Sequence, residues 1–547
     1  MEPIHTKKNS TSKTRHREWI FPLGMALVLV LLTAAPFLYG YVTRPAGTVF
    51  TGLHHLAPGD TNVFLSMIEQ VRQGENVFIN LYTHEEQARA FINPLWLSVG
   101  WLTKKDGISN LLALHIARSI WIVIFVFVLY RFLSYFITNA RARRWALAML
   151  LFASGLGVFF NPFLFDVNNI YEHPTDIWIA ESVNFLSALH SPHLLASLTL
   201  LVLTLYCMLR AFDTNRWRYS IGAAVSSFFL VWFHPFNGPT VFVVLLVYML
   251  VRFVHTKRIH WKWIQHYVVL GMGTLPPVLY LWLLAQRDWV IRNWSAQNIL
   301  PSPSLWMYMI GFGLLLPLAL VGIWRIIKDQ QSSRVFLVVW FLVTLVLMYV
   351  PVSFQRRMSE GVQIPLVLLA FFGVWWCWSR LRQRGGIWAT AGVMGLIIFL
   401  PLSNLQVLGQ DFFLFTTKHD LPYYLMQDEV DAMHWLRDHT DYTDVIFSSY
   451  YMGNYIPAYS GRVVWIGHGP QTIDLPYKFE DSEAFWSDDA DPPEKEQLLR
   501  DGRVTYVWYG RKEKELGSFD PSTKPYLREA HRTPHVVIYS VTPRQSE

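Results

Sequence analysis

The stretch WIFPLGMALVLVLLTAAPFLYGYV, residues 19–42, contains 24 consecutive residues without a charged side chain. About 20 apolar residues are enough for a helix to cross the hydrocarbon core of a bilayer. The run is too long for the apolar part of a cleavable signal peptide, and no small-residue cleavage site accompanies it. We therefore expect this stretch to be the first of several membrane-spanning helices.

Similar apolar runs recur as far as residue 406. They lie at 108–137, 145–164, 193–212, 219–236, 238–254, 264–286, 305–327, 334–352, 361–379 and 386–406. Only 16% of the residues are charged, whereas globular proteins have about 25%. The pattern predicts a polytopic α-helical membrane domain over 19–406 with about eleven helices. Both cysteines, Cys207 and Cys377, lie inside apolar runs, so no disulfide framework is predicted.

Lysine and arginine gather in every second connection between these runs. With a cytoplasmic N-terminus, all the clusters face the cytoplasm, at 141–144, 210–218, 252–262, 325–334 and 380–384. Cytoplasmic loops carry such an excess in membrane proteins. We therefore predict a cytoplasmic basic tail at 1–18 and, after an odd number of helices, a C-terminus outside. The net charge of +7 fits a plasma-membrane protein in contact with lipids and needs no nucleic acid.

The chain from 407 to 547 has the composition of a water-soluble domain. Charged residues return, and the apolar runs shorten to strand length, at 445–448, 462–466, 504–509 and 536–541. An amphipathic helix with a 3.6-residue period is expected before them, with apolar positions at Met426, Val430, Met433 and Leu436. A second helical candidate is 494–500. We predict a small extracytoplasmic α/β domain.

The long outer loop at 43–107 contains two polar segments, PGDTNVFLSMIEQ (58–70) and NLYTHEEQ (80–87). Asp60 follows a Pro-Gly turn at the start of an amphipathic helix. Its carboxylate either caps that helix or is a catalytic group at the membrane surface. The apolar run FINPLWLSVGWL (91–102) is too short to span a bilayer. We expect it to lie on, or dip into, the outer surface.

A second outer segment, 161–193, is acidic and contains no lysine or arginine. Its carboxylates and histidines are Asp166, Glu172, His173, Asp176, Glu181, His190 and His193. Carboxylates and imidazoles are ligands of divalent metals, so the segment is either a cation site or a solvated acidic loop; the spacing is not diagnostic. His234, in WFHPFNGP, is equally compatible with a hydrogen bond at a helix end and with contact to a substrate.

An arginine pair stands on the outer side, against the general charge trend. The segment PVSFQRRMSEG (351–361) places Arg356 and Arg357 at an outer helix boundary. Arginine binds phosphate oxygens through paired hydrogen bonds. The two side chains either hold a lipid-linked phosphate or extend to the headgroups of outer-leaflet lipids.

Carboxylates and arginines on one side of a membrane suit glycosyl transfer from a lipid phosphate. A carboxylate acts as base toward the acceptor hydroxyl, and cations stabilise the departing phosphate. The sequence has neither a Gly-rich phosphate loop of the P-loop type nor an HExxH helix. Cytoplasmic nucleotide chemistry and zincin proteolysis are therefore not indicated.

The whole pattern resembles the type-C superfamily of membrane glycosyltransferases. The segments that carry this resemblance are GDTNVFLSMIEQ (59–70), LYTHEEQARAFINPLWLSVGWL (81–102), FQRRMSEGVQIPL (354–366) and GNYIPAYSGRVVWIGH (453–468). Members have an acidic residue in the first outer loop, the place that Asp60 occupies, and often a second acidic loop and an extracytoplasmic domain. In particular the chain resembles bacterial members related to protein mannosyltransferases and to transferases of lipid A or polysaccharide sugars.

The resemblance implies a glycosyltransferase that moves a sugar from a polyprenyl-phosphate donor to an envelope glycan, lipid or protein outside the cytoplasm. Asp60 is then the base and Arg356 and Arg357 hold the donor phosphate. Residues expected to line an acidic cavity or hold a cation are Glu172, His173, Asp176 and Glu181, and possible substrate contacts are Glu85, His193 and His234.

Several alternatives remain open. Gly59 and Asp60 stand where many mannosyltransferases have paired acidic residues, so Glu69, Glu85 and Glu86 also qualify as the base. No cofactor is certain, although a divalent metal is possible. Possible acceptor contacts in the tail are Tyr451, Asn454, Tyr455 and His468, unless that stretch is a buried strand–turn–strand core. The rival functions are a transporter or flippase for a lipid-linked sugar and a non-catalytic envelope assembly protein.

Overall fold

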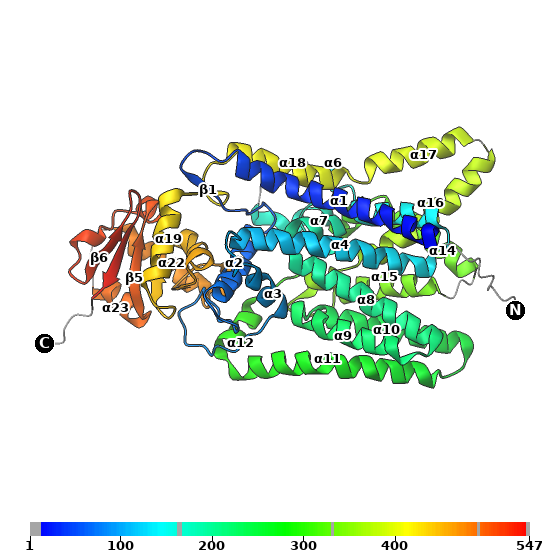
Figure 1. The fold of residues 1–547 in the computed structure, drawn as a ribbon, viewed down its shortest axis with the longest axis horizontal. Coiled ribbons are helices and arrows are strands. Elements are labelled where there is room, and N and C mark those ends of the chain that lie inside the picture. Colours follow the sequence, from blue (N-terminus) through cyan, green and yellow to red (C-terminus); the bar gives the residue numbers. More distant parts are fainter. Residues whose placement is uncertain (1–11, 161–166, 330–332, 385, 489–492, 543–547) are drawn as a thin grey trace. The chain divides into compact units, whose positions relative to one another are not determined.

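The structure is a computed structural model that describes residues 12–160, 167–329, 333–384, 386–488 and 493–542 (Figure 1). The chain forms two compact units. The first, the helical unit, consists of Met1–Ala35, Arg118–Leu275 and Pro301–Gly409. The second, the loop–tail unit, consists of Pro36–Ala117, Pro276–Leu300 and Gln410–Glu547.

Every apolar run that was predicted to cross the membrane contains a helix, which confirms a polytopic helical protein. These helices are α1 (Ser12–Val42), α4 (Asn110–Phe136), α5 (Ala140–Phe152), α8 (Pro192–Thr214), α9 (Trp217–Phe233), α10 (Asn237–Thr256), α11 (Trp261–Arg287), α13 (Leu305–Phe312), α14 (Leu315–Lys328), α15 (Val335–Leu347), α16 (Gln363–Arg384) and α17 (Gly386–Phe399). Three of them, α8, α9 and α10, lie side by side in Figure 1 and pack on one another.

The helices differ in their ability to cross a bilayer. Within the described residues, 7 helical stretches are long and apolar enough, and α13 and α14 form an eighth as a pair bent by 83°. Gly313 stands at this bend with a φ of +50°, a conformation that glycine adopts without strain. Since α9, α15 and α17 are shorter than 18 residues, the count of about eleven spans stays a prediction.

Glycines allow close packing inside the helical unit. A Cβ atom on Gly322 of α14 would lie 2.0 Å from the carbonyl oxygen of Leu369, and one on Gly373 of α16 would lie 2.0 Å from that of Leu318. Small residues at such crossings let two helix backbones approach, which is a main source of helix association in lipid. The pair α14–α16 is therefore fixed by backbone contact rather than by interlocking side chains.

The tail contains a five-stranded mixed sheet with the strand order β4-β3-β5-β7-β6. The strands are β3 (Val445–Phe447), β4 (Val463–Val464), β5 (Val504–Tyr509), β6 (Leu527–Arg532) and β7 (Val537–Val541). The first three are parallel, while β7 is antiparallel to β5 and to β6. All four predicted strands are confirmed with small shifts of their ends.

The sheet has apolar side chains on both faces, and helices cover each face. Ile446 and Ile538 point into one buried cluster, which α19 (Gln427–His439) closes with Met433. Phe447 points into a second cluster, which α22 (Leu475–Ser487) and α23 (Pro493–Asp501) close. Successive residues of a strand face opposite ways, so β3, β4, β5 and β7 each contribute to both clusters. The predicted α/β domain and both of its predicted helices are confirmed.

Strand β6 was missed by the sequence analysis. Its residues, LREAHR, are mostly polar, and only Leu527 is buried. Edge strands often carry charged side chains, which discourage pairing with other chains. The alternating apolar pattern that identifies half-buried strands is therefore absent at this edge.

The outer loop folds together with the tail. Strand β1 (Thr48–Phe50) pairs antiparallel with β2 (Tyr424–Met426), and Thr51 donates a hydrogen bond to the carbonyl oxygen of Tyr423 at 3.0 Å. The loop continues with α2 (Pro58–Arg72) and α3 (Pro94–Leu102), whose first turn is capped by the Asn93 side chain. The short helix expected at 91–102 is thus present, and its location at the membrane surface stays a prediction.

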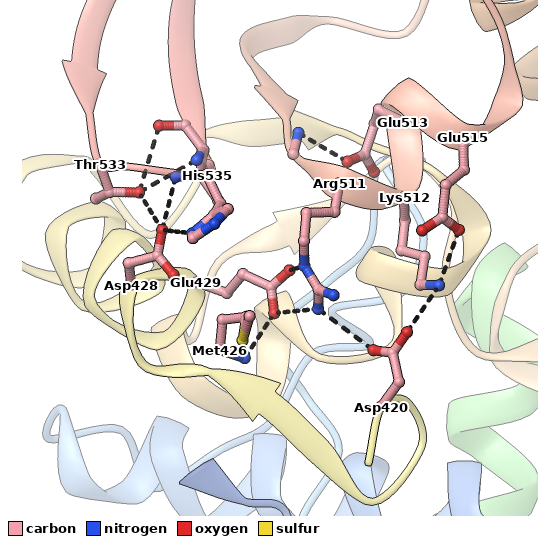
Figure 2. A network of polar contacts seen from close by, with 12 residues as sticks. Asp420, Met426, Asp428, Glu429, Arg511, Lys512, Glu513, Glu515, Thr533 and His535 are labelled. Carbon is pink, nitrogen blue, oxygen red and sulfur yellow. Dashed lines mark hydrogen bonds and ion pairs between the residues drawn. The ribbon is translucent and has the colours of Figure 1, made fainter. Parts of the chain in front are cut away.

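A polar network holds α19 to the short helix α24 (Arg511–Leu516) (Figure 2). Glu429 is buried and receives two hydrogen bonds from Arg511, at 3.0 and 3.3 Å. Arg511 also contacts Asp420 at 3.3 Å, and Lys512 contacts the other oxygen of Asp420 at 3.2 Å. The buried carboxylate of Glu429 is compensated by these contacts and by the backbone N–H of Met426.

We expect Arg511→Met to lower the stability of the tail domain by about 2–3 kcal/mol, because it leaves the buried Glu429 carboxylate without its cation. The measurement is the melting midpoint of the full-length protein in detergent. Arg532→Met is the matched control, since the Arg532–Glu529 pair is exposed on β6 and exposed pairs contribute little. Equal midpoints for the two variants would contradict the assignment.

Candidate functional site

Asp60 lies in the first turn of α2, where it faces a histidine from the tail. The helix starts after Ala57, which has a positive φ of 49° and provides no side-chain cap, so Asp60 is not the capping residue itself. A negative charge in the first turn is favoured by the helix dipole. The Asp60 carboxylate lies 3.2 Å from Nε2 of His468, and 47% of its side chain is exposed.

His468 is buried beside Asp60 and leaves no room for a larger residue at position 59. A Cβ atom on Gly59 would lie 2.8 Å from Cδ2 of His468. The His468 ring also packs edge-on against Tyr82, with ring centroids 5.8 Å apart. Glycine at position 59 therefore allows the His468 imidazole to approach the Asp60 carboxylate.

The stretch 450–468 is not the strand–turn–strand core that was considered for it. It forms two short helices, α20 (Tyr450–Gly453) and α21 (Ile456–Ser460), before β4. A left-handed Gly461 ends α21. Tyr455 is a core residue whose hydroxyl donates to the carbonyl oxygen of Pro422 at 3.1 Å, whereas Tyr451 is exposed and Asn454 is half-buried.

The other acidic residues of the loop have different surroundings. Glu69 is buried, and burial raises its pKa although Gln73 and Asn110 donate to its carboxylate. Glu86 is almost fully exposed. Among the candidates for a base in this loop, Asp60 combines a side chain that is 47% exposed with a histidine nitrogen 3.2 Å away.

Glu85 forms a buried ion pair with Lys478 at 2.6 Å. Burial raises the pKa of Glu85, but the charge and hydrogen bond of Lys478 and a hydrogen bond from Thr83 together outweigh burial and hold the pKa below its usual value. His84 stacks on Trp465 beside this pair, and burial, followed by the Lys478 charge, lowers the pKa of His84 to about 4. Glu85 thus joins the loop to α22, and its carboxylate is already paired with the Lys478 ammonium group.

The second outer segment does not bring its carboxylates together. Asp166 lies outside the described residues. Asp176 is fully buried in η2 (Thr175–Ile177), where one oxygen accepts the backbone N–H groups of Gly155 and Gly157 at 2.9 and 3.1 Å. Burial raises its pKa to about 6. Glu172 is exposed, and within the described residues none of these groups belongs to a set with metal-ligand spacing.

The arginine pair lies in η4 (Gln355–Ser359) of the helical unit and contacts aromatic rings and a carboxylate. Arg356 lies 3.5 Å from Glu181 and stacks over Trp178 at 5.2 Å. Arg357 lies over the ring of Phe236 at 4.5 Å. The Arg356 charge offsets the effect of burial on Glu181, and the pKa of that carboxyl is held below its usual value.

A buried pair, His234 and Glu360, lies close by in the same unit. Nδ1 of His234 is 2.5 Å from the Glu360 carboxylate, which is fully buried, although the angle is not that of a hydrogen bond. The ring of His193 is 5.8 Å from that of His234. His193 and His234, both predicted as possible substrate contacts, therefore lie close together. The sequence analysis missed Glu360, although it is the one acidic residue in the segment QRRMSEG.

These groups form a cluster of two arginines and two carboxylates, Arg356, Arg357, Glu181 and Glu360. Charge-assisted hydrogen bonds between arginine and an anion are usually about 2.7–2.9 Å long. The Arg356–Glu181 contact of 3.5 Å is longer, so an incoming phosphate can compete for the guanidinium. The two arginines of the cluster could bind an anion, although their formal charges are matched by its own two carboxylates.

No family model matches the sequence, and no curated protein sequence matches it. Solved structures do. The oligosaccharyltransferase of Archaeoglobus fulgidus, tethered to an acceptor peptide, aligns with a TM-score of 0.54 and 12% identity over 89% of this chain and 69% of that chain. Its complex with zinc and sulfate aligns with a TM-score of 0.52 and 12% identity over 88% and 67%.

A bacterial structure, ArnT from Cupriavidus metallidurans bound to undecaprenyl phosphate, covers 94% of this chain and 98% of its own, with 12% identity and a TM-score of 0.49. The assignment of the fold rests on the archaeal structures, which align better. The chain has the fold of that archaeal oligosaccharyltransferase.

Proposed function

We propose that this chain is an integral membrane glycosyltransferase that moves a sugar from a polyprenyl-phosphate donor to an acceptor outside the cytoplasm. The observation that carries the proposal is the partly exposed Asp60 carboxylate against the buried His468, in a chain with the fold of an oligosaccharyltransferase. Fold alone does not define activity, so the chemistry of Asp60 and His468 must support the proposal.

Asp60 acts as the base. As a nucleophilic group of the acceptor attacks the anomeric carbon of the donor sugar, Asp60 takes its proton. The bond between that carbon and the phosphate oxygen breaks, and the electron pair leaves with the polyprenyl phosphate. A base must combine access to the substrate with a fixed orientation. The exposed half of Asp60 supplies access, and His468 supplies orientation.

Arg356 and Arg357 hold the donor phosphate. The leaving group gains negative charge as the sugar departs, and fixed cations stabilise that charge most in surroundings of low polarity. The aromatic faces of Trp178 and Phe236 support the two guanidinium groups. Glu181 occupies Arg356 until the phosphate replaces it.

These steps use only side chains of the chain itself. The archaeal structure with zinc raises the question of whether the acidic segment here suits a cation. Asp176 uses one oxygen for two backbone N–H groups, and Glu181 faces Arg356. Asp176 and Glu181 therefore have separate partners, and the described residues of the segment offer no shared set of metal ligands.

The outer location of the site is part of the proposal and is supported by the Lys and Arg distribution, while chain parity supports the view that loop and tail share one side. Val42 at the end of α1, Asn110 at the start of α4 and Arg287 at the end of α11 all belong to the loop–tail unit. Because a compact unit lies on one side of the membrane, an even number of crossings must connect α4 to α11. The predicted topology meets this condition, because α4, α5, α8, α9, α10 and α11 then make six crossings.

The proposal predicts that Asp60→Asn reduces transfer at least about 100-fold, because general bases contribute at least that much. The measurement is the release of undecaprenyl phosphate from undecaprenyl-phosphate sugars by the purified protein with an envelope extract as acceptor. Glu86→Gln is the matched control, since Glu86 is an exposed carboxylate in the same loop. Full release by Asp60→Asn would eliminate Asp60 as the base.

The same assay with increasing donor concentration tests the phosphate site. Arg356→Gln should raise the KM for the donor by about 10- to 100-fold, since a hydrogen bond to a charged group contributes about 1.5–3 kcal/mol. Arg503→Gln, which removes an exposed cation from the tail, should leave the KM unchanged. An unchanged donor KM in Arg356→Gln would assign the phosphate to other residues.

A further inference from the structure

Two adjacent histidines and an aspartate from a distant helix come together in the loop–tail unit. His54 and His55 lie in the connection 51–57 between β1 and α2, and Asp411 lies in α18 (Leu402–Thr417). One donor atom from each residue lies within 4.8 Å of those of the other two. His54 and Asp411 are buried, and the side chain of His55 is only 6% exposed.

The local hydrogen bonds do not satisfy this cluster. One oxygen of Asp411 lies 2.7 Å from Nδ1 of His55 and accepts the backbone N–H of His55 at 3.2 Å. The other carboxylate oxygen, Oδ2, is buried and makes no hydrogen bond to the described residues, and neither does Nε2 of His55. A buried acceptor without a partner is costly, and a carboxylate of this kind needs a cation.

We propose that His54, His55 and Asp411 bind a divalent transition-metal ion, with Zn²⁺ as the best match. Two imidazoles and one carboxylate are a common zinc donor set that leaves the fourth position for water. Mg²⁺ and Ca²⁺ prefer donor sets made only of oxygen. The proposal uses none of the acidic residues of the second outer segment, and binding does not depend on the proposed transferase activity.

The geometry is close to what zinc requires. Tetrahedral ligands about 2.0–2.1 Å from the ion lie roughly 3.3 Å from one another. The His55–Asp411 contact of 2.7 Å must therefore lengthen slightly, and the widest separation, within 4.8 Å, must shorten.

The ion would fix the segment that carries Asp60. His55 precedes Asp60 by five positions, and the helix that contains Asp60 starts directly after the connection 51–57. A metal shared with α18 ties this connection to a second chain segment. His54, His55 and Asp411 are accordingly positioning residues for Asp60.

The test is zinc binding by the full-length protein in detergent, purified with a tag that contains no histidine and stripped with EDTA. We expect elemental mass spectrometry after dialysis to find about one Zn²⁺ per chain. We also expect excess ZnCl₂ to raise the melting midpoint of the protein by roughly 2 °C or more. MgCl₂ should cause no shift. Absence of bound zinc in the unmodified protein would overturn the proposal.

Two separate variants locate the ion, so that a folding defect in one does not decide the result. His54→Gln and Asp411→Asn should each lose the bound zinc and the shift of the midpoint. The exposed neighbours His439 and Asp438 provide matched controls, and His439→Gln and Asp438→Asn should bind zinc like the unmodified protein. Full zinc occupancy in either site variant would place the ion elsewhere and refute this site.

Discussion

The arrangement depends on one constraint: the loop after the first membrane helix and the C-terminal tail fold as a single unit. Strands β1 and β2 pair, Thr51 bonds to Tyr423, and Asp60 meets His468. These contacts join residues that are about 370 to 410 positions apart in the chain. Since one unit cannot lie on two sides of a membrane, loop and tail share a compartment whatever the orientation of the chain.

The tail therefore has a clear physical task. The Asp60 carboxylate stands in the first turn of α2, and 47% of its side chain is exposed. The tail supplies a buried imidazole on one side of it, and Gly59 makes room for that ring. The Glu85–Lys478 pair joins the same loop to α22. Catalytic groups must be held within narrow limits to be effective, and these contacts are the means available here.

The sequence predicted what depends on local pattern. Long apolar runs identified the helices, and short apolar runs in the tail identified β3, β4, β5 and β7. The sequence pattern did not predict β6, whose residues are mostly polar. It named Asp60, Arg356 and Arg357, but it did not find the partners that define their surroundings. His468 and Glu360 become informative only when the fold brings distant segments together, and the same holds for Asp411 beside His55.

The shared compartment is tested most directly by labelling single cysteines with a membrane-impermeant maleimide in cells whose plasma membrane is intact. Cys207 and Cys377 are first replaced by serine. Tyr477→Cys in the tail and Glu86→Cys in the loop are highly exposed, and Lys257→Cys marks a predicted cytoplasmic connection. The account predicts that the first two react in intact cells and that Lys257→Cys reacts only after permeabilisation. Reaction of Tyr477→Cys and Glu86→Cys on opposite sides, or of both only after permeabilisation, would contradict it.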